Sequence, residues 1–138
     1  MRFWAALILV LTSPSVLQAA PPEMKPIDDF LLQNETSTNG AVEVFVGLRC
    51  LTLYGLLSRY TADNNMADAA KVFKERSGTA LGIVMKFQKP YNDEYTRGQV
   101  ELIGEAYTER FLQAKARTGN FGDDEVIKSD LKTCGEMF

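Results

Sequence analysis

Apolar side chains recur at three- and four-residue intervals in four stretches of the chain after residue 39. This is the period of an amphipathic α-helix, and strand-like alternation does not compete with it. Short links between the stretches favour antiparallel neighbours. The pattern predicts an all-α domain over residues 39–138, a small antiparallel four-helix bundle. Its helices are expected at about residues 41–60, at 66–89 with a cap at Asn64 or Asn65, at 94–117 with a cap at Asn92 or Asp93, and from Asp123 or Asp124 to about Thr133.

The first of these helices, at residues 41–60, is apolar on nearly all sides. One broad face includes Val46 and Leu53, and the opposite side still carries Leu48 and Leu51. A helix with this pattern normally lies at the centre of its bundle. The alternative is that its second side forms an interface. We favour the central position.

The first twenty residues have the pattern of a secretory signal peptide. Arg2 precedes the apolar run Phe3 to Leu11, and Ala20 marks the expected cleavage point. This run is much shorter than the roughly 20 apolar residues of a membrane span. A buried N-terminal helix is the alternative, and no later run is uninterrupted enough to suggest a transmembrane helix. Residues 21–38 are expected to form a flexible tether, with a short helical turn near its middle, at 28–33.

Composition excludes several classes of chemistry. The chain has no histidine, only two cysteines and a net charge of −3. The lack of histidine excludes Ser-His-Asp and Cys-His catalysis and most zinc sites. A mildly acidic chain is not suited to coating nucleic acid or anionic membranes. We therefore expect no catalytic residues, no metal, no cofactor, no nucleic-acid partner and no stable membrane insertion after signal cleavage.

The two cysteines, Cys50 and Cys134, are far apart and both lie on apolar helical stripes. Export would place them in an oxidising compartment, either the periplasm or the extracellular medium, where such pairs form disulfides. We expect a disulfide that joins the first predicted helix to the C-terminal helix. Two buried free thiols are the alternative.

Arg49 lies near the middle of the apolar face of the first predicted helix. A buried guanidinium needs a carboxylate, backbone carbonyls or a ligand anion, because an unpaired buried charge is costly. Arg49 either pairs structurally with an acidic residue or forms a ligand-binding site, to which Arg110 would contribute. An enclosed pocket lined by Arg49 without a carboxylate partner would favour the ligand site.

Gly78 and Gly82 face away from the predicted core, beside Met85. Glycine lowers helix stability by up to about 1 kcal/mol relative to alanine. Their presence suggests a candidate interaction surface that a partner protein or a second copy approaches closely. The alternative is a helix that bends or frays at Ser77 and Gly78.

The leading functional hypothesis is an exported, non-enzymatic domain that binds or modulates another protein or forms a homodimer. The alternative is a carrier or sensor of a small anionic ligand, with a basic site around Arg49. An enzyme that relies on carboxylates or tyrosines alone is the least favoured class.

Overall fold

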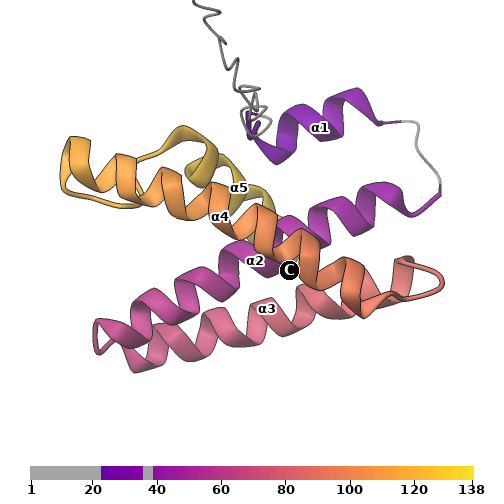
Figure 1. Ribbon diagram of the computed structural model, residues 1–138, viewed down its shortest axis with the longest axis horizontal. Coiled ribbons are helices and arrows are strands. Elements are labelled where there is room, and N and C mark those ends of the chain that lie inside the picture. Colours follow the sequence, from indigo (N-terminus) through magenta and orange to yellow (C-terminus); the bar gives the residue numbers. More distant parts are fainter. Residues whose placement is uncertain (1–22, 36–38) are drawn as a thin grey trace, which may run out of the picture.

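All regular elements in the computed structural model are helices over the residues that it describes, 23–35 and 39–138 (Figure 1). The all-α prediction is confirmed, and the four predicted helices correspond to the last four of five observed ones. The expected signal peptide, residues 1–20, lies outside the described residues. The helices are α1 (Ile27–Gln33), α2 (Ala41–Asp63), α3 (Ala67–Phe87), α4 (Asp93–Thr118) and α5 (Glu125–Met137).

Local capping chemistry explains where the later helices begin and end. The Asn92 side chain accepts a hydrogen bond from the backbone of the first turn of α4, and Asp124 does the same for α5. Gly119 ends α4 in the left-handed conformation, with a φ of 80°. The cap predicted for α3 at Asn64 or Asn65 is wrong. Asn65 instead turns the chain with a φ of 59°, and α3 begins without a side-chain cap.

α2 lies at the centre of the fold and contacts each of the other four helices. α3 returns alongside it as an antiparallel neighbour, α4 crosses it, and α1 lies on the side away from α3 (Figure 1). Val46 and Leu53 of α2 are completely buried. The central position expected for this helix is therefore observed.

α2 is also long and apolar enough to cross a membrane by length and composition, with a mean hydropathy of 1.5. The run is interrupted by polar residues and therefore did not suggest a transmembrane helix from the sequence. Half of the most apolar stretch of α2 is buried inside the protein. Burial among other helices gives these apolar residues a place in the core of the fold.

Small residues let α2 and its neighbours approach closely. A Cβ atom added at Gly47 would lie 2.8 Å from Cγ2 of Val84 on α3, a distance too short to tolerate. A Cβ at Gly104 of α4 would lie 3.6 Å from the Thr52 side chain of α2. Gly47 of α2 and Gly104 of α4 thus contribute to packing within the chain.

A disulfide between Cys50 and Cys134 joins α2 to α5, with a Cα–Cα distance of 5.6 Å across a sequence separation of 84. The predicted pairing is confirmed. Cys50 nevertheless lies in the second helix of the chain, because α1 precedes α2.

α1 lies within the segment that was expected to form a flexible tether. Its Ile27 is completely buried, and Leu31 packs against the core. The Phe30 ring stacks on Phe45 of α2 with 3.7 Å between centroids. The packed part of the chain therefore begins before residue 39, and the predicted helical turn is the first helix of the fold.

Candidate functional site

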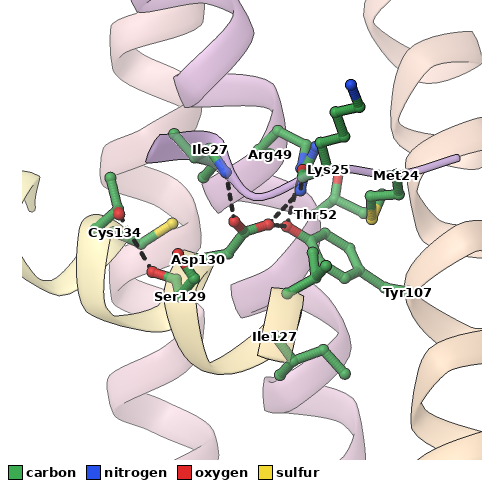
Figure 2. A network of polar contacts seen from close by, with 12 residues as sticks. Met24, Lys25, Ile27, Arg49, Thr52, Tyr107, Ile127, Ser129, Asp130 and Cys134 are labelled. Carbon is green, nitrogen blue, oxygen red and sulfur yellow. Dashed lines mark hydrogen bonds and ion pairs between the residues drawn. The ribbon is translucent and has the colours of Figure 1, made fainter. Parts of the chain in front are cut away.

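Arg49 lies in a buried polar network at the junction of α2, α4, α5 and the segment before α1 (Figure 2). Its Nη2 donates to a carboxylate oxygen of Asp130, and its Nε donates to the Tyr107 hydroxyl over 3.0 Å. Asp130 is completely buried and also accepts hydrogen bonds from Tyr107 and from the backbone N–H of Ile27. Arg49 therefore has the carboxylate partner that a structural role requires.

The network holds its members in defined protonation states. Burial raises the pKa of the Tyr107 hydroxyl well above its usual value, and the nearby Asp130 carboxylate adds to this. Burial alone would lower the pKa of Arg49, but Tyr107 and Asp130 outweigh it and raise the pKa. At neutral pH Arg49 is a cation and Tyr107 is a neutral phenol that donates to Asp130.

The raised pKa of Tyr107 predicts a loss of stability at high pH. Because its pKa is higher in the folded protein than the value of about 10 in an unfolded chain, ionisation favours unfolding. Its contribution is fully present below about pH 10 and is lost above it, by about 1.4 kcal/mol per pH unit. Urea unfolding between about pH 9 and about pH 11.5 measures this slope. The variant Tyr107→Phe keeps the other titrating groups, so an identical slope in both proteins would contradict the prediction.

Arg49 and Asp130 of this network, together with Arg110, bind the backbone of residues 24–27, which lead into α1 and which we call the N-terminal strap. Arg49 Nη2 donates to the carbonyl oxygen of Lys25 over 3.0 Å, and Arg110 Nη2 donates to that of Met24 over 2.8 Å. Just after the strap, the Thr133 hydroxyl donates to the side-chain carboxylate of Asp28 over 2.5 Å. Helices α2, α4 and α5 thus all contribute to holding the strap.

Arg110, the second candidate ligand-binding residue, also has a carboxylate partner. Its Nη1 lies 3.1 Å from Oδ2 of Asp124, and its side chain is 23% exposed. Arg49 and Arg110 are brought close to the same strap, as the ligand hypothesis required. Each, however, is neutralised by an aspartate, which leaves neither guanidinium unpaired for a ligand anion.

A groove of about 1010 Å³ lies between α1 with its preceding strap on one side and α4 on the other. We call it the α1–α4 groove. Phe45 and Arg49 of α2 also line it. A neighbouring hollow of about 400 Å³, near the start of α4, shares Phe45, Arg49, Gln99 and Ile103 with it. The apolar lining of the groove consists of Met24, Pro26, Phe30, Phe45, Leu102, Ile103 and Ala106.

Leu102 is the most exposed apolar residue of the groove lining. Its exposed fraction is 62%, although it belongs to a helix with partners on its other side. Leu112 on the same helix is similarly exposed, at 64%, but does not line the groove. These two leucines form a matched pair for testing whether the groove is a binding surface.

The charged groups along the groove are mainly acidic. Both walls carry carboxylates, which form no ion pair within residues 23–35 and 39–138. Lys25 is the lining cation that has no carboxylate partner in this part of the chain, since Arg49 and Arg110 are paired. The groove thus combines an apolar floor with an acidic rim, formed by Glu23 and Asp29 on one wall and Glu105 and Glu109 on the other.

The candidate surface on α3 is less apolar than the groove. Gly78 and Gly82 are exposed, and a Cβ at either would meet no atom within 4 Å. Met85 is 46% exposed beside them, whereas Val72, the other exposed large apolar residue of α3, lies more than three turns away along the helix and about 140° from Met85 around its axis. The helix runs unbroken through Gly78, so the chain does not fray there.

Sequence reasoning missed Asp130 and the groove. Asp130 stands three residues after Ile127 and four before Cys134, on the same helical stripe. A lone carboxylate on an apolar stripe was the signal that could have paired it with Arg49. The groove gave no such signal, because its two walls are distant in sequence.

Comparison with protein-family models, with curated proteins and with solved structures found no match. Within the described ranges, no group of three or more potential metal-ligating side chains lies together. The function must therefore be argued from the geometry of this chain alone.

Proposed function

We propose that this protein is an exported, non-enzymatic interaction domain. It binds a segment of another protein in the α1–α4 groove, and apolar side chains of that segment anchor it there. The observation that carries the proposal is the groove itself, an open hollow of about 1010 Å³ lined by exposed Leu102 and by aromatic rings. Apolar surface left open and rimmed by polar groups is typical of interaction sites. The scaffold in this proposal is the antiparallel bundle expected from the sequence, with α2 at its centre.

The disulfide and the composition support the rest of the proposal. A disulfide is typical of oxidising compartments, which agrees with the signal pattern of residues 1–20. The periplasm or the extracellular space is therefore the proposed location. The lack of histidine removes the commonest general base from any catalytic mechanism.

The groove is better suited to a protein segment than to a small anion. Its volume lies at the upper end of the range of about 300–1,000 Å³ that small-molecule pockets occupy. Its two arginines are already paired with Asp130 and Asp124, and its remaining charged rim would repel an anion. No observation favours the anionic-ligand alternative over the protein partner.

Substituting Leu102→Asp is expected to reduce capture of the partner at least tenfold, because a charge replaces an apolar anchor at the centre of the interface. Leu112→Asp, on the same helix but outside the groove, is the matched control and should retain capture. The measurement is affinity capture with the purified protein from the native extracytoplasmic fraction, quantified by mass spectrometry. Both leucines are largely exposed, so neither substitution should unfold the protein.

A third variant, Gly82→Arg, separates the groove from the α3 surface. It places a long side chain on a face where a Cβ meets no atom within 4 Å, so folding should be unaffected. Capture that survives Leu102→Asp but is lost in Gly82→Arg would move the interface to α3 and contradict the proposal.

A further inference from the structure

Building on the proposed interaction function, we propose that the segment bound in the α1–α4 groove is a basic amphipathic α-helix of the partner protein. Three properties of the groove lead to this conclusion. They are the sign of the charge on its rim, the hydrogen bonds already made by the backbone of its walls, and its length.

The negative charge of the rim favours a positively charged occupant. Glu105 and Glu109 lie one turn apart on α4, and Glu23 and Asp29 lie on the opposite wall. An apolar segment bound between these walls passes two carboxylates on each side, and Lys25 is the lining cation that has no carboxylate partner among the described residues. Lysine or arginine side chains on both flanks of such a segment would meet opposite charge, whereas acidic flanks would be repelled.

The hydrogen-bonding state of the walls selects a helix over an extended strand. The backbone of α1, α2 and α4 bonds within each helix, and the carbonyls of Met24 and Lys25 are bound by Arg110 and Arg49. An extended peptide would bury its own N–H and C=O groups against walls that offer few backbone partners, which is costly. A helix satisfies these groups internally and offers side chains at intervals of three and four residues.

The length of the groove sets the size of the helix. Along α4 its lining runs from Gln99 to Gln113, which is about 21 Å of helix axis. A partner helix of about 15 residues, roughly four turns, would span it. Its apolar stripe would face Leu102, Ala106 and Phe45, with basic residues on either side of the stripe.

The test uses three labelled synthetic peptides of about 15 residues, each long enough for four helical turns. The first has leucines at helical spacing and lysines elsewhere, the second has the same residues in scrambled order, and the third has glutamates in place of the lysines. Fluorescence anisotropy gives the Kd of each at about 50 mM and about 300 mM salt. We expect the first peptide to bind at least tenfold more tightly than the other two and to weaken at high salt.

Variants of the rim test the charge directly. The double substitution Glu105→Gln and Glu109→Gln should weaken binding of the first peptide about three- to tenfold. The matched control, Glu75→Gln with Glu101→Gln, removes two exposed carboxylates outside the groove and should leave the Kd unchanged. Circular dichroism should show that the first peptide becomes helical when it binds.

The outcomes separate this inference from the proposed function. Binding that requires Leu102 but shows no preference for the basic peptide would overturn the inference and leave the groove as an interaction site. A dimer in analytical ultracentrifugation that Leu102→Asp dissociates would identify a second copy as the occupant and also overturn it. If Leu102→Asp changes neither peptide binding nor partner capture, the proposed function fails together with the inference.

Discussion

Replacing Asp130 with asparagine is expected to lower the free energy of unfolding by about 3–5 kcal/mol. The Asp130 carboxylate is completely buried and accepts hydrogen bonds from Arg49, Tyr107 and the Ile27 backbone. The substitution leaves a buried guanidinium without a counter-charge and turns a new N–H donor toward groups that already donate. Small domains are stabilised by only about 5–15 kcal/mol in total, so the loss should be large.

Urea unfolding of the purified variant measures the effect, and two controls define its origin. Asp123 pairs with Lys128 on the surface, and Asp123→Asn should leave the unfolding midpoint almost unchanged. Tyr107→Phe removes one hydroxyl from the network and should cost about 1–3 kcal/mol. If Asp130→Asn shifted the unfolding midpoint as little as Asp123→Asn does, the buried pair would not be important for stability.

Removing the disulfide is expected to lower the free energy of unfolding by about 2–5 kcal/mol. The bond closes a long loop, with 84 positions between Cys50 and Cys134, and so restricts the unfolded chain. It also holds α5, a helix of only 13 residues that would be marginal alone. Because α5 carries Asp130, losing the bond should also weaken the hold on the N-terminal strap.

Chemical denaturation of the double variant Cys50→Ala and Cys134→Ala gives the magnitude of this effect. Hydrogen exchange then gives its location, and faster exchange is expected in α5 and α1 before the rest of the fold. A reducing agent should destabilise the wild type and leave the double variant unchanged. An unfolding midpoint that does not respond to reduction in the wild type would refute the prediction.

Periodicity along the chain predicted the helices well, because each buries an apolar stripe of ordinary length. The disulfide followed from two cysteines on such stripes. Both predictions depend on local pattern and on burial, which a single sequence records directly. The central place of α2 followed in the same way from a helix that is apolar on nearly all sides.

α1 and the partner of Arg49 depend on contacts that local pattern does not record. α1 has only seven residues, and its buried Ile27 is held by groups from α2 and α5. An isolated helix of this length would not be stable, so propensity could indicate only a turn there. The position of Arg49 on an apolar helix face indicates that it needs a partner. Identifying Asp130 as that partner requires knowing how α5 lies on α2.

The groove could not be predicted for a related reason. One of its walls lies in a segment that had been assigned to a tether, and the other is the side of α4 next to its core stripe. Glu105 and Glu109 are exposed on α4, where carboxylates ordinarily belong to a solvated helix face. Their significance depends on Glu23 and Asp29 on the opposite wall, more than 70 residues earlier in the chain.

The N-terminal strap is held mainly through its main chain. Arg110 and Arg49 bind the carbonyls of Met24 and Lys25, and Asp130 binds the N–H of Ile27. Contacts of this kind do not depend on which side chains stand at positions 24 and 25, so substitutions there would leave these hydrogen bonds in place, although the Met24 side chain also packs against the core. The spacing to Ile27 is constrained, because one residue inserted or deleted between Lys25 and Ile27 would shift the buried isoleucine and its N–H contact out of register with the two carbonyl contacts.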